Sequence, residues 1–489
     1  MFEKISRSTV KLLKNPNFWL GTILILGIIV RLYKINSPLA DWHSWRQADT
    51  ASVSKIYVQE GINLLYPRYH DVSSIQTGQT NLKGYRFVEF PLYNFFHAQL
   101  ALIFPRIQFE VWGRLVSIFS AFFSGYLLFL IGKKYISPLG GILASLFYAV
   151  NPYNIFFTRV ILPEPLAVSL GLLAVYLYVK HTEKKSFIYL ILSSIVLSLG
   201  ILVKPFVIFY AIPILYLAYQ VYGLYGLFIS PKAFIRHLIY LDLIIIPFFL
   251  WRIWVNKFPQ GIPFFTWMFN YDTLRFHPAF FRWIFGERIG RMILGIWGVF
   301  PFGLGLIMAK KSYLAHFFIL GSLIYMSTVA SANIRHDYYQ AFIIPSIALV
   351  WAQGMDYLLK TKVFIKPLSY LVSLFCFTMM VGFGFYQIKD FYNINHPEII
   401  EAGKEVDKLT PKDALIIAPY NGDTAFLYQT GRWGWPAVDD TFENLVKKGA
   451  DYYISLTKDD ADTKKVMETY TIVRETPNFI IINLNQKKK

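Results

Sequence analysis

Residues 18–33, FWLGTILILGIIVRLY, form a long apolar segment, and DWHSWRQAD, residues 41–49, follows it. The apolar segment approaches the roughly 20 residues that cross a bilayer. It therefore brings an acid, an imidazole, a guanidinium and two indoles to one membrane surface. The segment is followed by Arg31, Lys34 and Asn36 and not by a small-residue cleavage site, so we expect a retained anchor.

The stretch after Asp41 also carries helix signals. Ser44 and Gln47 have the spacing of a capping box, and Gly61 is placed to end the helix. A partial apolar stripe lies between these ends, formed by Trp45, Val53, Ile56 and Tyr57. The pattern predicts an amphipathic helix in the membrane interface, with Asp41 just before its positive end. The alternative is that Asp41 and Ser44 only cap backbone structure.

The composition indicates a polytopic α-helical membrane protein. Of 489 residues, 55% are hydrophobic and 18% are aromatic, and the mean hydropathy is +0.41. The apolar stretches predict about 11 spans by the length rule. They cover residues 18–33, 112–131, 139–157, 166–179, 187–203, 206–222, 238–255, a stretch ending at 310, 313–330, 341–359 and 368–386.

The charge distribution orients these spans. The net charge is +18, but residues 390–489 contain 16 acidic and 13 basic residues, which leaves +21 for the membrane part. Lys and Arg concentrate in short loops and in the N-terminal tail, residues 1–14, which we expect in the cytoplasm. This distribution does not favour nucleic acid as a partner. Phosphates of membrane lipids or of a lipid-linked substrate are the expected anions.

The predicted transmembrane domain covers residues 1–387 and carries two large exterior loops. The first loop, residues 36–111, contains a short apolar segment at 90–104 that is interrupted by Asn94, His97 and Gln99. This segment predicts a second amphipathic juxtamembrane or re-entrant helix. The second loop, residues 256–291, is rich in aromatic residues and proline.

Residues 388–489 predict a small soluble α/β domain on the exterior side. Helices are expected at 399–409, 442–448 and 464–470, and strands at 414–418, 452–456 and 479–484. Residues 431–436, GRWGWP, are either a sugar-contacting loop or a structural turn. Asp439 and Asp440 resemble a metal pair, but an exposed turn is the better interpretation.

A set of ionisable residues falls at the exterior ends of the expected helices. Such groups are costly at that depth unless they are paired or functional, and structural salt bridges are the alternative interpretation. Together they offer carboxylates for proton abstraction and cations for a phosphate, which suits glycosyl transfer from a lipid phosphate. The set comprises Asp41, Arg46, Glu89, Arg159, Glu164, Lys204, Arg335, His336 and Asp337.

These residues resemble a known pattern. Over residues 18–386 the chain resembles the GT-C superfamily of integral membrane glycosyltransferases, on the branch with protein O-mannosyltransferases and the lipid A aminoarabinose transferase. The resemblance rests on an acid after the first span, a Glu-Phe-Pro-Leu-Tyr entry, an Arg-to-Glu turn, a lysine after the fifth span and a His-Asp-Tyr-Tyr turn. In this chain they are Asp41, residues 89–93, residues 159–164, Lys204 and residues 336–339.

The resemblance implies a polyprenyl-phosphate sugar donor, a lipid, glycan or protein acceptor, and inverting transfer of a hexosyl or pentosyl group. It places the reaction at the outer face of a membrane, expected to be the bacterial plasma membrane. Asp41 matches the acid proposed as base or acceptor-positioning group, and Glu164 matches the second-loop acid. Many relatives have Asp-Glu at the first position, where Asp41 is here followed by Trp42. The substrate-binding candidates are Arg46, Glu89, Arg159, Lys204, Arg335, His336 and Tyr338.

No obligatory cofactor is expected. Some relatives hold a divalent metal near the site and others need none. His43, Glu60 and His277 are the candidate ligands, but they lack the tight spacing of a metal motif. A divalent metal therefore stays open as an alternative.

Two other functions are alternatives. A transporter or flippase of a lipid-linked saccharide predicts ionisable residues near mid-membrane and duplicated spans, which the sequence does not show. A non-catalytic membrane assembly protein would use the same charges only as scaffolding.

Overall fold

The computed structural model describes residues 15–308 and 311–488, and these divide into two compact units. The helical unit comprises residues 15–35, 115–251 and 265–390, and the mixed unit comprises residues 36–114, 252–264 and 391–488. The predicted cytoplasmic tail, residues 1–14, and the end of the expected eighth span at 310 lie outside the described residues.

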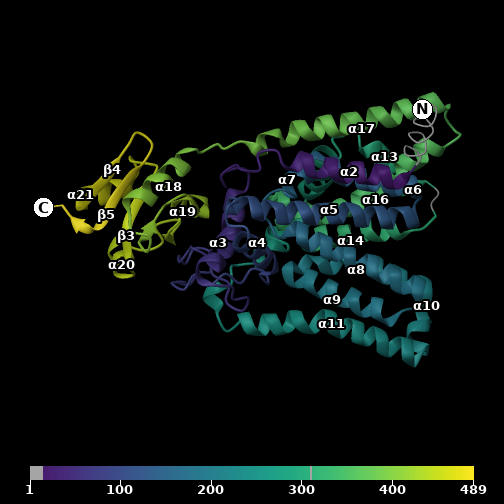
Figure 1. Cartoon of the computed structure of the whole chain (residues 1–489), viewed down its shortest axis with the longest axis horizontal. Helices are drawn as coiled ribbons and strands as arrows, with labels where there is room; N and C mark the ends of the chain where they lie inside the picture. Colours follow the sequence, from purple (N-terminus) through teal and green to yellow (C-terminus); the bar gives the residue numbers. More distant parts are fainter. Residues whose placement is uncertain (1–14, 309–310, 489) are drawn as a thin grey trace. The chain divides into compact units, whose positions relative to one another are not determined.

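The helical unit is built of long apolar helices that lie side by side (Figure 1). Six stretches in the described residues are long and apolar enough to cross a membrane. They are α5 (Phe109–Tyr135), which begins in the mixed unit, α8 (Glu164–Lys184), η1 with α10 (Pro205–Tyr210, Ala211–Ile229), α11 (Pro231–Val255), η6 with α16 (Asp337–Ile343, Ile344–Lys360) and α17 with η7 (Lys366–Ile388, Lys389–Tyr392). Four shorter apolar helices accompany them: α2 (Pro16–Arg31), α6 (Pro138–Val150), α9 (Phe187–Val203) and α14 (Leu314–Thr328).

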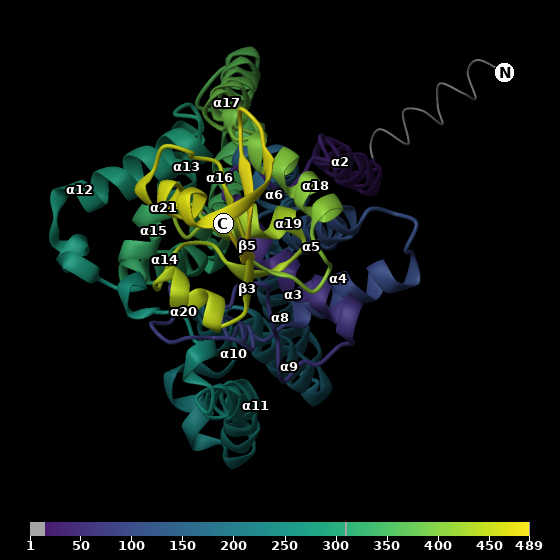
Figure 2. The same ribbon diagram turned by 90° about the vertical axis from the view of Figure 1, so that its left-hand side faces the viewer.

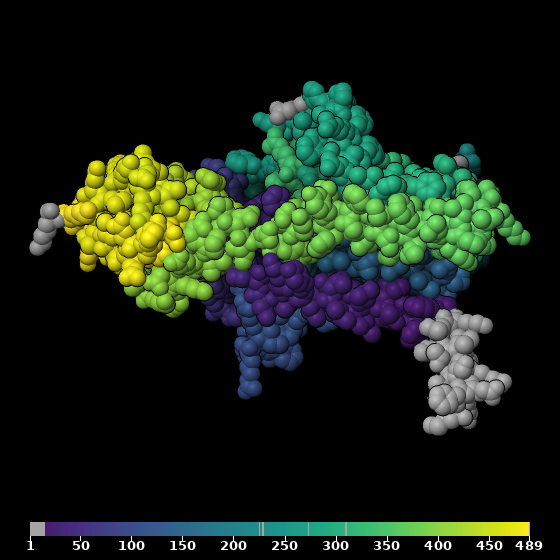
Figure 3. Space-filling view, turned by 90° about the horizontal axis from the view of Figure 1, so that it is seen from above, coloured from purple at the N-terminus to yellow at the C-terminus, as the bar shows by residue number. Residues whose placement is uncertain are grey.

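The outward surface of these helices is apolar. In the space-filling view α17, in green, forms a continuous ridge on one face (Figure 3). Its exposed side chains include Leu368, Leu371, Leu374, Phe375, Phe383 and Phe385, and those of α11 include Ile235, Leu238, Leu241, Ile246, Phe249 and Leu250. Apolar side chains exposed along such long helices are stable against lipid and not against water, so the chain is an integral membrane protein.

Shorter elements link these helices. They are α7 (Pro152–Phe157), η3 (Thr266–Met268), η4 (Tyr271–Phe276), α12 (Pro278–Phe281), the π-helical η5 (Arg282–Ile293), α13 (Val299–Ile307) and α15 (Ala330–Arg335). The expected eighth span is represented by α13, which has only 9 residues. The count of about 11 spans therefore stays a prediction.

The mixed unit contains a five-stranded sheet in the order β2-β1-β3-β5-β4. β1 is parallel to β2 and β3, whereas β5 is antiparallel to β3 and β4. Figure 2 shows the sheet on edge, with α20 and α21 on one side and α18 and α19 on the other. The elements are α3 (Ser44–Glu60), α4 (Leu92–Ile103), η2 (Pro259–Gly261), α18 (Glu398–Leu409), β1 (Leu415–Ile417), α19 (Thr424–Thr430), β2 (Trp433–Trp435), α20 (Phe442–Lys447), β3 (Ala450–Ser455), α21 (Ala461–Thr469), β4 (Tyr470–Glu475) and β5 (Ile480–Lys487).

A segment of the loop at residues 36–111 extends this sheet beside β2. The Gly434 N–H donates to the His70 carbonyl, and the Val72 N–H donates to the Gly434 carbonyl, each at 2.9 Å. The Val72 side chain joins the apolar cluster of the sheet, together with Ile417 and Trp435. A side chain at position 434 would place its Cβ 1.7 Å from the Ile416 carbonyl oxygen, so the close approach requires glycine.

Helix α3 differs from its prediction. It spans Ser44–Glu60 and is followed by Gly61, as expected, but no capping box forms. His43 precedes the helix with φ 55° and offers no side-chain cap. The expected amphipathic stripe is wrong, because residues on all sides of the helix are buried from Arg46 to Ser54. The helix is enclosed by the loop of its own unit and by α19.

In residues 388–489 the three predicted helices and three predicted strands are confirmed as α18, α20, α21, β1, β3 and β5. Sequence reasoning missed α19, β2 and β4, and residues 431–436 contain strand β2. Asp439 accepts hydrogen bonds from the Ser74 N–H and hydroxyl at 2.7 and 2.8 Å, and Asp440 forms an ion pair with Lys448 at 2.8 Å. Both carboxylates have structural partners.

Candidate functional site

The structure places the candidate residues in both compact units. The mixed unit holds Asp41, Arg46 and Glu89, and the helical unit holds Arg159, Glu164, Lys204, Arg335, His336 and Tyr338. Within each unit the structure shows which of them are partners.

Asp41 is held by a residue of helix α3. The Gln47 side-chain amide donates to Asp41 Oδ1 at 2.6 Å and to the Trp42 carbonyl at 3.2 Å. The left-handed conformation of His43 turns the chain between the two residues, and the helix starts at Ser44, three residues after Asp41. Both side chains are buried, Asp41 at 4% exposure and Gln47 at 0%. The acid therefore has a defined orientation inside its unit.

Arg46 and Glu89 are partners of each other. Arg46 lies in the first turn of α3, Glu89 lies shortly before α4, and Arg46 Nη2 approaches Glu89 Oε1 at 2.5 Å. Both side chains are buried. Their charges offset each other, because a buried charge without a partner is strongly unfavourable. The two residues that we predicted as separate substrate contacts thus form one ion pair.

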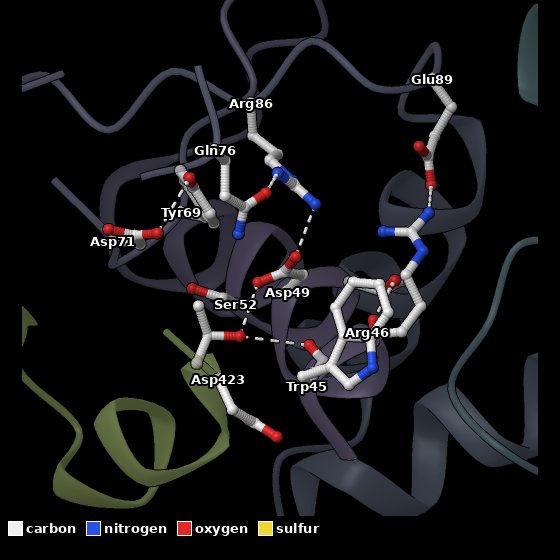
Figure 4. A network of polar contacts seen from close by, with 12 residues as sticks. Trp45, Arg46, Asp49, Ser52, Tyr69, Asp71, Gln76, Arg86, Glu89 and Asp423 are labelled. Carbon is white, nitrogen blue, oxygen red and sulfur yellow. Dashed lines mark hydrogen bonds and ion pairs between the residues drawn. The ribbon is translucent and has the colours of Figure 1, made fainter. Parts of the chain in front are cut away.

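A second buried pair was missed in the sequence. Asp49 Oδ2 lies 2.5 Å from Arg86 Nη2, and Arg86 also donates to the Gln76 side chain (Figure 4). Asp49 Oδ1 accepts a hydrogen bond from the Thr424 hydroxyl at 2.7 Å. Asp49 is one helical turn from Arg46 in the stretch DWHSWRQAD, and this spacing was the available signal.

Burial shifts the ionisation of groups around this network. Burial raises the pKa of Asp71 to about 6, although hydrogen bonds from Ser73 act in the opposite direction. Burial also lowers the pKa of His70 to about 3 and raises the pKa of Asp423 to about 6. All three shifts favour the neutral form, as expected for groups removed from water. Asp71 and Asp423 therefore stay protonated to a higher pH than free aspartates, and His70 stays neutral to a lower pH than a free histidine.

Glu164 and Lys204 form a buried ion pair in the helical unit. Lys204 Nζ lies 3.0 Å from Glu164 Oε1, with 7% and 1% of the side chains exposed. Glu164 is the first residue of α8 and Lys204 follows the last residue of α9. The two helices pack against each other, so the start of one meets the end of the other. A carboxylate at a helix start and an ammonium at a helix end are both favoured by the helix dipoles.

Arg159 lies in the predicted turn after α7 and is fully buried. Its Nη2 donates to the Lys34 carbonyl at 2.9 Å, and its guanidinium lies 5.9 Å from the centre of the Phe156 ring. Neighbouring Thr158 accepts a hydrogen bond from buried Arg31 at 2.7 Å. The turn therefore contributes Arg159 and receives Arg31 from the end of α2, and these two arginines contact backbone and hydroxyl groups.

The predicted turn at residues 336–339 and the preceding Arg335 are surrounded by aromatic rings. His336 stacks on Tyr338 and meets the edge of Trp267, with ring centres 5.6 Å apart in both cases. The Arg335 guanidinium lies 5.6 Å from the centre of the Tyr271 ring. Trp267 and Tyr271 come from residues 256–291, the loop that was predicted to supply aromatic residues.

Asp337 has a cationic partner that the sequence did not suggest. Arg288 of η5 approaches its carboxylate at 3.7 Å and donates to the Ile334 carbonyl at 2.8 Å. Arg288 lies 46 residues before Ile334 in the sequence, and no local spacing connects it with the turn.

The candidate metal ligands are not grouped by the structure. Glu60 pairs with Arg68 at 2.6 Å at the surface of the mixed unit, where His43 also lies, and His277 belongs to the helical unit. Within residues 15–308 and 311–488, no three His, Cys, Asp or Glu residues are arranged to hold a metal ion.

Comparisons with known proteins support one fold. Residues 89–251 match the family model of dolichyl-phosphate-mannose-protein mannosyltransferases. No curated protein sequence matches the chain. The crystal structure of ArnT from Cupriavidus metallidurans bound to undecaprenyl phosphate superimposes with a TM-score of 0.66 at 12% identity, covering 95% of this chain and 98% of that one. The chain has the GT-C fold.

Two further GT-C structures are similar. The oligosaccharyltransferase of Archaeoglobus fulgidus, solved with Zn and sulfate, gives a TM-score of 0.54 at 9% identity, covering 91% of this chain and 68% of that one. The arabinofuranosyltransferase AftD from Mycobacteria gives 0.57 at 12% identity, covering 95% of this chain and 41% of that one. The predicted resemblance to GT-C glycosyltransferases is confirmed.

Proposed function

We propose that this GT-C protein transfers a hexosyl or pentosyl group from a polyprenyl-phosphate donor to an acceptor at the outer face of the membrane. One observation carries the proposal. The fold is shared over nearly the whole of both chains with ArnT, whose structure contains undecaprenyl phosphate. The buried ionisable residues supply the acid, base and cation chemistry that such a transfer needs.

In the proposed step, a hydroxyl of the acceptor attacks the anomeric carbon of the donor sugar. The bond from that carbon to the phosphate oxygen breaks, and polyprenyl phosphate leaves with the electron pair. Asp41 accepts the hydroxyl proton as the new glycosidic bond forms. Attack opposite the leaving group inverts the configuration of the anomeric carbon. Asp41 suits this role because Gln47 orients its carboxylate.

The cationic candidates have distinct roles in the proposal. Lys204 and Arg159 stabilise the negative charge of the departing phosphate. Glu164 acts through Lys204, because its carboxylate lies against the Lys204 ammonium. His336, Tyr338 and Arg335 contact the sugar or acceptor through the aromatic group at their turn. The Arg46–Glu89 pair shapes the surroundings of helix α3 and carries little net charge.

The proposal includes a membrane topology. About 11 spans would place the segment after α17 outside the cytoplasm, in the bacterial plasma membrane. Residues 388–489 would form an exterior α/β domain and the lysine-rich short loops would face the cytoplasm. We propose no obligatory metal, so transfer should persist in the presence of a chelator.

The decisive experiment incubates the purified full-length protein with a panel of polyprenyl-phosphate sugars and candidate acceptors. We expect release of polyprenyl phosphate with one donor, and loss of release in the Asp41→Asn variant with folding intact. A flippase would instead move the lipid across proteoliposomes without releasing polyprenyl phosphate. Wild-type turnover in Asp41→Asn would exclude Asp41 as the base.

A further inference from the structure

The Gln47 side chain makes two hydrogen bonds that the start of helix α3 does not require. Its amide nitrogen has two hydrogens, and each has an acceptor, Asp41 Oδ1 at 2.6 Å and the Trp42 carbonyl at 3.2 Å. The second bond fixes the rotation of the amide, because only the nitrogen side can donate to a carbonyl. The first bond is then directed to one oxygen of the acid.

Helix α3, which carries Gln47, is itself held on another face. Asp49 lies two positions after Gln47, so its side chain points about 200° away around the helix. Its carboxylate accepts from the Arg86 guanidinium at 2.5 Å (Figure 4). It also accepts from the Thr424 hydroxyl at 2.7 Å. Thr50 is the next residue of the helix, and its carbonyl accepts a hydrogen bond from the Asn94 side-chain amide at 2.7 Å. These bonds restrain the rotation of α3 and leave the Gln47 face directed to Asp41.

We infer that Gln47 is a positioning residue for Asp41, which sets the direction of the carboxylate that accepts the acceptor proton. The inference rests on the proposed function and adds a residue to it. Gln47 touches neither donor nor acceptor in this assignment and acts only through Asp41. Displacing a reacting group by about 1 Å can cost about 100-fold in rate, so the contribution should be large.

The test compares two buried glutamines in the full-length protein. Gln47→Met has nearly the volume of glutamine but no hydrogen-bond donor. The matched control is Gln353→Met on α16, where the lost amide donates to the Gly305 carbonyl at 2.7 Å in a helix contact. Steady-state transfer is measured with the donor that the wild type accepts, together with thermal unfolding of each variant.

We expect Gln47→Met to lower kcat by about 10- to 100-fold, with the donor KM within about twofold of wild type. Gln353→Met should lose a similar amount of thermal stability and keep its kcat. Gln47→Asn keeps the amide on a side chain one methylene shorter, and should show the same kcat loss if Gln47→Met fails to fold.

The outcomes separate this inference from the proposed function. Wild-type kcat in Gln47→Met, with Asp41→Asn inactive, overturns the inference and leaves the base assignment standing. Equal kcat losses in Gln47→Met and Gln353→Met, matching the loss of folded protein, would assign Gln47 a purely structural role and also overturn it. Full activity in Asp41→Asn removes the base assignment and the inference together.

Discussion

The Thr424 hydroxyl donates a 2.7 Å hydrogen bond to Asp49 Oδ1 across 375 positions of the chain. Asp49 is 1% exposed and Thr424 is 5% exposed, so water does not replace either partner. The bond links α19 of the C-terminal segment with α3, which lies within residues 36–111. A carboxylate in this setting depends on each of its donors.

Replacing Thr424 by valine should therefore destabilise the protein. The change removes the hydroxyl and keeps the volume, so a buried carboxylate oxygen loses its donor at a cost of about 1–3 kcal/mol. Thr424→Ser retains the hydroxyl and should lie close to wild type. Thermal unfolding of both variants in the same detergent measures the difference. Equal stability of the valine and wild-type proteins would mean that water or another donor replaces the hydroxyl.

The Glu164–Lys204 pair gives a prediction about charge. Lys204→Met leaves the Glu164 carboxylate buried without its ammonium, which typically costs about 3–5 kcal/mol. The double variant Lys204→Met/Glu164→Gln has no charge at either of these two positions and should regain most of that stability. Both variants should show at least about a tenfold loss in donor kcat/KM, because the cation for the phosphate is absent. Recovery of kcat/KM in the double variant would show that Lys204 serves only the fold.

Asp423 should make the stability of the folded protein depend on pH. Burial raises its pKa from 3.8 to about 6, so between these values the folded state binds a proton that the unfolded chain has released. The contribution of Asp423 to the free energy of unfolding is fully present at low pH. It falls as the pH rises from 3.8 to about 6. Asparagine stays neutral and still caps α19, where Asp423 accepts from the Ala425 N–H. Asp423→Asn should gain about 1–3 kcal/mol at pH 7 and nothing below pH 4. Unfolding at pH 4, 5, 6 and 7 checks the trend, and a pH-independent difference would contradict it.

Reporter fusions test the proposed topology. A reporter after Lys311 should report the cytoplasm, and one after Asp390 should report the exterior. The lysine-rich loops at 180–185 and 360–366 should agree with the first reporter. If the Lys311 and Asp390 reporters fall on the same side, the expected number of spans is wrong by an odd number.

Much of the helical unit could be predicted because long apolar runs have few alternatives in a membrane. Helix α9 begins at Phe187 and ends at Val203, as the hydropathy indicated. The region before Lys311 was harder to predict, because the π-helical η5 and the short α13 stand where the sequence indicated a single span. Neither Pro nor charge spacing in that region signals a π-helix.

The ion pairs were less predictable than the helices. The sequence indicated Glu164 and Lys204 as separate site residues, and only the packing of α8 on α9 makes them partners. Arg86 and Thr424 were overlooked because their common partner, Asp49, looked like an ordinary polar residue of a surface helix. Strand β2 was missed because its Trp-Gly-Trp sequence contains a glycine that the sheet requires for a close approach.

The backbone pairing of residues 70–72 with Gly434 bears on how the protein is made. Residues 70–72 form the edge of this sheet, and the ribosome synthesises them long before strand β2, with which they pair. Until Gly434 has been delivered to the same compartment, the His70 carbonyl and the Val72 N–H cannot form their native hydrogen bonds. The loop at residues 36–111 thus completes its structure only at the end of biogenesis, and chains cut short before Gly434 should be recognised by proteases that survey unfinished membrane proteins.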